Sequence, residues 1–154
     1  MPKQSAGLLL YRRTPTLEVF LVHPGGPIWA KKNFAAWTVP KGEYTGDEHP
    51  LAAAIREFAE ETGFTVPPAT HPYIDLGSIQ QPNGKLVRAW AFEGDCDPTA
   101  LVSNTCTIEW PPRTGRRLTI PEVDRGAWFT LADASGHIFK GQQPLLERLR
   151  EALA

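Results

Sequence analysis

The stretch GEYTGDEHPLAAAIREFAEETGF, residues Gly42–Phe64, carries the strongest structural signal in the chain. Within it, a helix is predicted over Pro50–Thr62, because proline is favoured in the first helical turn and a glycine such as Gly63 is favoured just after the last. Side chains that can pack together recur along one face of this helix at helical spacing. They are Leu51, Ile55, Phe58 and Thr62. The pattern predicts a helix that buries one face against a core.

Three glutamates lie on the opposite side of the predicted helix. Glu57, Glu60 and Glu61 stand at positions i, i+3 and i+4, so they share an arc of roughly 100°. Carboxylates so close repel one another, and the commoner meaning of such a pattern is an acidic face exposed to solvent. The alternative is a site for a divalent cation, because Mg²⁺ prefers hard oxygen ligands.

The residues around the glutamates favour the cation site. The segment fits the pattern G-x5-E-x7-R-E-U-x-E-E-x-G-U, where U is bulky and apolar, and chance agreement in one window is about one in a billion at average residue frequencies. The matching residues are Gly42, Glu48, Arg56, Glu57, Phe58, Glu60, Glu61, Gly63 and Phe64. This pattern is the Nudix box, and the chain resembles the Nudix (MutT-like) hydrolase family. The likeness extends more loosely to SAGLLLYRR (5–13), WTVPKG (37–42) and PEVDRGAWF (121–129).

The resemblance implies a fold, a reaction and a cofactor. The fold is α+β, an α/β/α sandwich around a mixed β-sheet, which agrees with strands in the middle of the chain and helices flanking them. The reaction is hydrolysis of a nucleoside diphosphate linked to another group, by attack of water at phosphorus. The cofactor is Mg²⁺, for which Mn²⁺ can substitute, and a nucleotide substrate is the expected partner.

The resemblance also implies roles for residues of the box. The implied metal ligands are Glu57, Glu60, Glu61 and the backbone carbonyl of Lys41. Arg56 has the role of holding the acidic residues in register through hydrogen bonds to their carboxylates. Glu48 is assigned a structural role rather than a catalytic one.

The sequence leaves open which residue removes the proton from water. Glu57 is the candidate if the base lies on the helix. Glu122, in the loop before Trp128, stands where other family members place a catalytic glutamate. Glu93, at the end of a predicted strand, stands where related enzymes often carry a further acidic metal ligand. For Glu93 and Glu122 alike, a surface carboxylate is the commoner meaning.

Substrate choice depends on residues outside the box. Trp29 and Tyr44 lie in predicted loops and are candidates to stack on a nucleobase. The candidates to pair with phosphates are Lys41, Arg113, Arg116 and Arg117. The stretches AGLLLYRR, EVFLVH and WTVPKGE look like diadenosine polyphosphate hydrolases, which favours a dinucleoside polyphosphate as substrate. Two alternatives stay open: a (d)NTP pyrophosphohydrolase of the MutT house-cleaning type, and a catalytically silent nucleotide-binding module.

Length and composition fit one globular domain over residues 1–154, with 42% hydrophobic and 21% charged residues. The net charge of −1 gives no electrostatic reason to bind duplex nucleic acid or a membrane surface. The apolar run Ala6–Leu10 is far shorter than the ~20 residues of a membrane span. Cys96 and Cys106 form no CxxC pair, so free thiols in a reducing compartment are expected. We therefore expect a cytoplasmic protein, and the oligomeric state stays open.

The remaining elements follow from alternation, turn residues and helical spacing. Strands are predicted over Ser5–Arg12, Leu17–His23, Trp37–Pro40, Tyr73–Ile79, Leu86–Glu93 and Ala127–Phe129. Further helices are predicted at about Leu131–Phe139 and Gln142–Leu153. Loops are predicted over Pro24–Ala36 and Lys41–His49, and irregular structure over Asp95–Arg117. The insertion at 103–117 has no counterpart in the simpler family pattern, so its role stays open.

Overall fold

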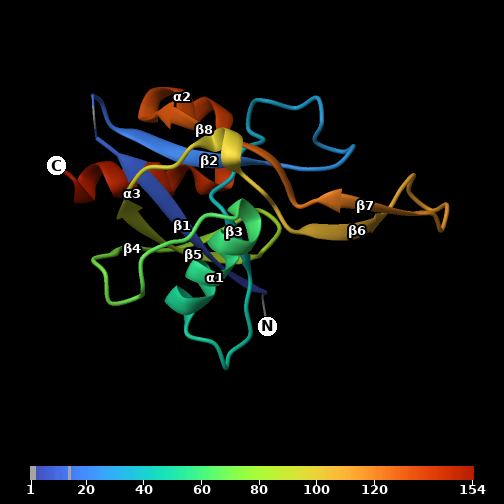
Figure 1. The fold of residues 1–154 in the computed structure, drawn as a ribbon, viewed down its shortest axis with the longest axis horizontal. Coiled ribbons are helices and arrows are strands. Elements are labelled where there is room, and N and C mark those ends of the chain that lie inside the picture. Colours follow the sequence, from blue (N-terminus) through green and yellow to red (C-terminus); the bar gives the residue numbers. More distant parts are fainter. Residues whose placement is uncertain (1–2, 14) are drawn as a thin grey trace.

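The computed structural model describes residues 3–13 and 15–154, which form a mixed β-sheet flanked by helices (Figure 1). The strands are β1 (Gln4–Arg12), β2 (Glu18–Pro24), β3 (Lys41–Glu43), β4 (Ile74–Gln80), β5 (Leu86–Glu93), β6 (Thr105–Glu109), β7 (Arg117–Pro121) and β8 (Val123–Thr130). The helices are α1 (Pro50–Thr62), α2 (Leu131–His137) and α3 (Gln143–Ala152), with 3₁₀ turns η1 (Pro98–Ala100) and η2 (Lys140–Gln142). In the main sheet the order is β4-β5-β1-β2-β8, with β3 also paired to β1. Because β1 and β5 are parallel and the other pairs are antiparallel, the predicted α+β class with a mixed sheet is confirmed.

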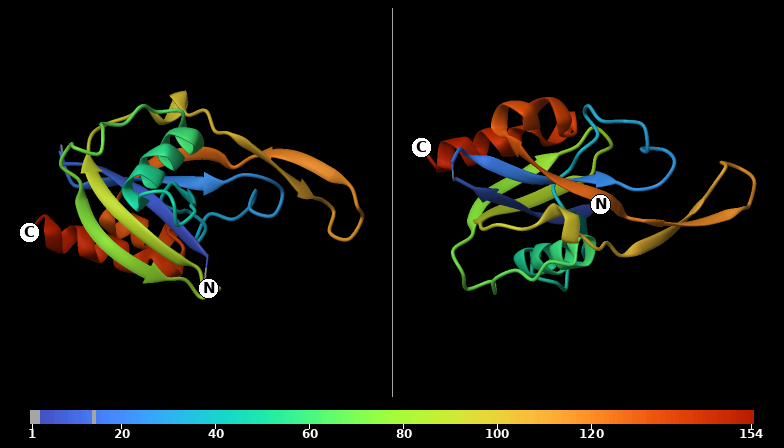
Figure 2. Two further views of the ribbon diagram at one scale, coloured as in Figure 1. Left: turned by 90° about the horizontal axis from the view of Figure 1, so that it is seen from below. Right: turned by 45° about the horizontal axis from the view of Figure 1, so that its top comes forward.

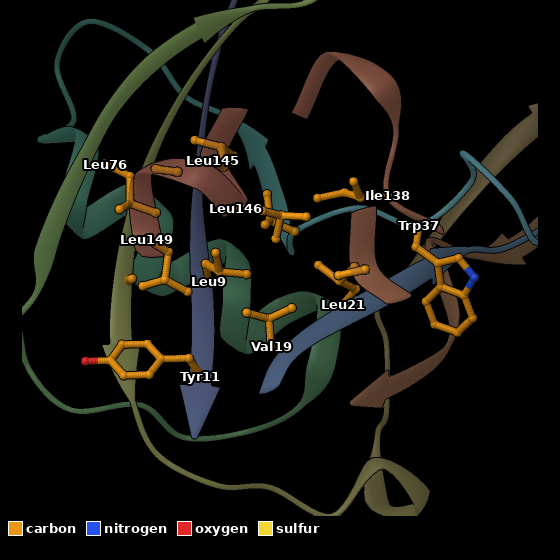
Figure 3. Close-up of a cluster of buried hydrophobic side chains, with 14 of the residues drawn as sticks. Leu9, Tyr11, Val19, Leu21, Trp37, Leu76, Ile138, Leu145, Leu146 and Leu149 are labelled. Carbon is orange, nitrogen blue, oxygen red and sulfur yellow. The ribbon is translucent and has the colours of Figure 1, made fainter. Parts of the chain in front are cut away.

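Helices cover both faces of the sheet, with α1 on one side and α2 and α3 on the other (Figure 2). The central strand β1 is apolar on both faces, as expected for a strand buried from two sides. Leu8 packs with Phe20 of β2 and Phe58 of α1. On the opposite face, Leu9 packs with α3, as Figure 3 shows. The residues drawn there on α3 are Leu145, Leu146 and Leu149.

The neighbouring strands β1 and β2 diverge, and this divergence creates room for the site. They pair at Tyr11 with Val19 and at Arg12 with Glu18, whereas the start of β1 pairs with β3. Gly7 permits this approach, since a Cβ there would lie 2.8 Å from the Pro40 carbonyl oxygen. The segment from Thr38 to Glu43 is therefore inserted between β2 and β1.

Two predictions about loops were wrong. Regular pairing begins at Lys41, in the predicted loop, and Trp37 and Thr38 make only isolated bridges. The segment predicted to be irregular contains β6, which pairs with β7 to form a two-stranded arm extending from the body of the protein (Figures 1 and 2). The alternation in TCTIE and RLTIP is the signal for this arm, because β-branched residues favour strands.

The last strand is also longer than predicted, since β8 starts at Val123 in order to pair along the whole of β2. None of the helices within the described ranges is long and apolar enough to cross a membrane.

Candidate active site

Helix α1 has the predicted bounds, and both of its ends are capped. The Leu51 N–H donates to Nδ1 of His49 at 3.2 Å, and Gly63 ends the helix with φ of 77°, a conformation that favours glycine. Its acidic face is not simply solvated. The residues Glu57 and Glu61 are each only 8% exposed, whereas Glu60 is exposed.

The two buried carboxylates are held against β3. Glu57 packs so closely on Gly42 that a Cβ there would lie 2.0 Å from Cδ of Glu57. The Lys41 N–H donates to Oε1 of Glu61 at 3.1 Å. The absence of a side chain at Gly42 therefore lets helix α1 place the carboxylates of Glu57 and Glu61 next to the backbone of Lys41. The carbonyl of Lys41 is the backbone group implied as a metal ligand.

Arg56 links three acidic side chains with one guanidinium group. Its Nε and Nη2 donate to the two carboxylate oxygens of Glu48 at 2.8 and 2.9 Å. Its Nη1 donates to Glu57 at 2.8 Å and to Glu60 at 3.2 Å. The hydrogen bond to Arg56 lowers the pKa of Glu48. This planar group fixes the orientation of Glu57 and Glu60, which a flexible lysine could not do in the same way.

Burial of the two carboxylates has an electrostatic cost that their hydrogen-bond donors only partly offset. The pKa of Glu61 is raised to about 8, mainly by burial and further by the charge of Glu122. The hydrogen bond from the Lys41 N–H opposes this increase. Burial also raises the pKa of Glu57, which the hydrogen bond from Arg56 opposes. A hard cation between these oxygens would offset that cost, so the donor set fits Mg²⁺.

Protein side chains alone do not enclose such a cation. Over residues 3–13 and 15–154, no group of three His, Cys, Asp or Glu side chains converges on one point. Backbone carbonyl, water or substrate oxygens would have to complete the coordination shell. Mg²⁺ commonly binds in this way, because it keeps several waters and bridges to substrate phosphates.

Glu122 reaches the same site through a chain of backbone hydrogen bonds. The Asn104 N–H donates to the Glu60 carbonyl near the end of α1, and the Glu122 N–H donates to the Asn104 carbonyl, both at 2.9 Å. The Gly25 N–H donates to the Glu122 carbonyl at 3.0 Å. The base of the β6–β7 arm is thereby attached to α1, and Glu122 lines a cavity together with Glu61.

Two cavities with some lining residues in common lie at the site. The first, the acidic chamber, has a volume of about 350 Å³ and is lined by Lys41, Glu61, Cys106, Ile120 and Glu122 among others. The second, the basic chamber, has a volume of about 490 Å³ and is lined by Lys41, Asn83, Lys85 and Lys140 among others. Trp29, Lys41 and Phe139 line both. Burial lowers the pKa of Lys41.

Phe139 is a site residue that the sequence did not reveal. It was assigned to a helix, but α2 ends at His137, and Phe139 instead meets Trp29 edge-to-face with the ring centroids 5.2 Å apart. The only available signal was the pair of residues Lys140 and Gly141 that follows, because glycine often marks the end of a helix.

Several predicted site residues lie elsewhere. Glu93 pairs in register with Tyr11, four residues along β1 from Gly7 and thus roughly 13 Å from the β3 end, and forms a salt bridge with Arg13 at 3.5 Å. Tyr44 donates to Gln4 at 2.8 Å and lines a different pocket. Three arginines are exposed on the outer part of the β6–β7 arm. They are Arg113, Arg116 and Arg117.

The close contact at Gly42 leads to a test of the arrangement. Gly42→Ala is expected to lower kcat by about a hundredfold, because the new Cβ must displace Glu57 and a misplacement of about 1 Å has effects of that size. Steady-state kinetics measures the loss. Gly46→Ala is the matched control in the same segment, since no atom lies within 4 Å of a Cβ there. Equal activity of the two variants would contradict the role assigned to the contact.

Comparisons with known proteins agree with this geometry. The family model described as the NUDIX domain matches residues 1–149. A Caenorhabditis elegans Ap4A hydrolase in a binary complex has a TM-score of 0.64 at 22% identity, covering 97% of each chain. The NUDIX domain of Shewanella oneidensis NrtR complexed with ADP ribose has a TM-score of 0.67 at 19% identity, covering 100% of this chain and 90% of that one.

A MutT protein from Methanosarcina mazei Go1 has a TM-score of 0.60 at 19% identity, covering 99% of this chain and 96% of that one. A search of curated proteins finds no match. At these identities the solved structures show a shared fold, and the family model shows membership. The predicted Nudix fold and family are thus confirmed, and the chain belongs to the NUDIX domain family, the Nudix hydrolases that act on pyrophosphate bonds in nucleoside diphosphate derivatives.

Proposed function

We propose that this protein is an Mg²⁺-dependent hydrolase of a nucleotide that contains a diphosphate linkage, with Mn²⁺ able to replace Mg²⁺. The ligands proposed for the cation are Glu57, Glu60, Glu61 and the Lys41 carbonyl. The observation that carries the proposal is the burial of two carboxylates against β3, one of which, Glu61, lines a cavity large enough for a small ligand. The Ap4A hydrolase and the ADP ribose complex among the structural neighbours support a nucleotide substrate.

The side chains have distinct parts in this chemistry. When bound, Mg²⁺ supplies charge neutralisation at the phosphate oxygens and increases the acidity of water. Arg56 fixes the carboxylates of Glu57 and Glu60 through its hydrogen bonds. The Lys41 side chain, in the wall between the two chambers, neutralises a phosphate of the substrate.

Glu122 is our candidate for the base that accepts the proton from the attacking water. It lines the acidic chamber beside Glu61, whereas the carboxylate of Glu57 is engaged by Arg56 at 2.8 Å. A general base contributes about 10²–10⁴ to a rate. Glu122→Gln is therefore expected to lower kcat by about that factor, to leave the affinity for Mn²⁺ nearly unchanged, and to remove the ionisation of a base from the pH profile of kcat. Near wild-type kcat would instead favour Glu57 as the base.

A nucleotide panel in ¹⁸O-labelled water tests the function itself. With Mg²⁺ present, we expect turnover of at least one nucleotide that contains a diphosphate linkage and a single ¹⁸O atom in one phosphate-containing product, measured by mass spectrometry. The labelled product also identifies which phosphorus is attacked. Binding without turnover across the panel would contradict the proposal and support a silent nucleotide-binding module.

We further propose that the protein works in the reducing cytoplasm. Cys96 and Cys106 are both free, as is usual for cysteines in such a compartment. Burial raises the pKa of Cys96 to about 12 and also raises that of Cys106. Both thiols are therefore poor nucleophiles, and neither has a part in the proposed reaction.

A further inference from the structure

We propose that the basic chamber is a subsite for a phosphorylated group, so that the enzyme prefers diphosphates whose second substituent carries additional phosphate over those whose second substituent is a neutral sugar. The favoured class is a nucleoside linked to a polyphosphate or to a second nucleotide. This inference rests on the proposed function, since it concerns the substrate of the same cleft.

The chamber is built between two segments that are far apart in the sequence. One is the turn between β4 and β5, closed by a hydrogen bond from the Gln81 N–H to the Lys85 carbonyl at 2.9 Å. The other is η2, whose Gly141 approaches Pro82 so closely that a Cβ would lie 3.0 Å from its Cδ. Neither segment belongs to the box, so the subsite is formed largely by residues outside it.

Gln142, the last residue of η2, connects the two segments through its side chain. Its side chain is fully buried, and its amide nitrogen donates to Gln81 at 3.2 Å and to Thr38 at 2.8 Å. Its amide oxygen accepts the Val39 N–H at 3.0 Å. Because each polar atom of this amide is engaged, the two segments that line the chamber are held in fixed relative positions.

Charge distinguishes the two chambers. The basic chamber is lined by Lys41, Lys85 and Lys140, and no carboxylate is among its described lining residues. Lys85 forms a salt bridge with the exposed Glu43 at 3.1 Å. By contrast, the acidic chamber contains Glu61 and Glu122.

Lys41 relates the proposed site of diphosphate cleavage to the proposed subsite for a phosphorylated group. Since Lys41 lines both chambers, an anhydride held at Lys41 directs one of its substituents toward the acids and the other toward the lysines. Lysine ammonium groups form charge-assisted hydrogen bonds with phosphate oxygens but gain much less from a neutral hydroxyl group. A substituent with additional phosphate therefore profits from Lys85 and Lys140, and a sugar does not.

Kinetics on two adenosine substrates tests the subsite. The variant is Lys85→Gln/Lys140→Gln, and the substrates are diadenosine tetraphosphate and ADP-glucose. We expect kcat/KM for the tetraphosphate to fall by about tenfold to a hundredfold, mainly through KM, and the loss for ADP-glucose to be at least about tenfold smaller. Lys31→Gln is the matched control, because Lys31 is exposed and lines neither chamber. Equal losses on the two substrates would overturn the inference.

Calorimetry can measure the binding of inorganic tripolyphosphate in the presence of a chelator. This measurement tests the subsite independently of the proposed hydrolase activity. We expect the wild-type protein to bind this probe at least about tenfold more tightly than the double variant. Affinity that does not depend on the two lysines would overturn the subsite even if nucleotides are hydrolysed. Lysine-dependent binding in a protein that hydrolyses nothing in the panel would support the subsite and reject the hydrolase proposal.

Discussion

Glu61→Gln and Glu57→Gln are each expected to lower kcat by about a thousandfold or more while the protein stays folded. An amide is nearly isosteric with a carboxylate but lacks the charge that a hard cation requires, and the proposed transition state depends on that cation. Both side chains are buried against β3, and a water molecule in place of the lost ligand would not restore the lost charge. Steady-state kinetics with saturating Mg²⁺ measures the loss.

The control is Glu151→Gln, because Glu151 is exposed on α3, away from the cleft lining. Thermal unfolding in a chelator shows whether the fold survives. Burial raises the pKa of Glu61 in the folded protein to about 8, above its ordinary value, so the metal-free folded protein loses stability as pH rises from about 4.5 to 8. Glu61→Gln removes that loss, and its Tm at pH 8 in chelator is expected to exceed that of the wild type. Near wild-type kcat in both glutamine variants would reject the proposed ligands.

Removal of divalent cations is expected to reduce turnover to the background rate. Glu57 and Glu61 lie within about one turn of α1, and the charge of Glu57 contributes to the raised pKa of Glu61, so without a cation the site repels the anionic substrate. Turnover should return on addition of Mg²⁺ or Mn²⁺. Initial rates after exhaustive chelation and after re-addition measure the dependence.

Thermal stability supplies an independent readout of the same dependence. Mg²⁺ at 100 times its dissociation constant should stabilise the wild type by about 2.7 kcal/mol through mass action. The Glu57→Gln/Glu61→Gln variant should show little of this increase. Substantial turnover in the chelated protein, or equal stabilisation of both proteins, would argue against cation-dependent chemistry at this site.

The sequence predicted the helix and its bounds because both ends carry local signals. Pro50 and Gly63 stand at positions where their backbone preferences are strong, and the observed α1 spans the predicted residues. Most strands of the sheet were also predictable from their apolar residues, whereas the mixed pairing was implied by the family resemblance. The short strand β3 was not predictable, because Lys41–Glu43 pairs with β1 only where β1 and β2 diverge, and that divergence depends on tertiary packing rather than on local propensity.

The site was predictable where it lies on one helix and less so where distant segments meet. The spacing of Glu57 and Glu61 gave their common face, but their burial depends on the approach of Gly42. Glu93 was a candidate metal ligand because it ends a strand, but a strand end alone does not show which end of the sheet holds the site. Glu122 reaches the cleft through backbone hydrogen bonds at Asn104, which no side-chain pattern reveals.

Binding of Mn²⁺ followed by electron paramagnetic resonance tests the central claim most directly, since the signal of the free ion is lost on binding. The wild type and the Glu151→Gln control are expected to bind Mn²⁺ saturably with equal affinity in the absence of nucleotide. The Glu57→Gln/Glu61→Gln variant is expected to bind it at least about a hundredfold more weakly, because it lacks two charged ligands. Equal affinity of this variant and the wild type would contradict the claim that the buried face of α1 holds the cation.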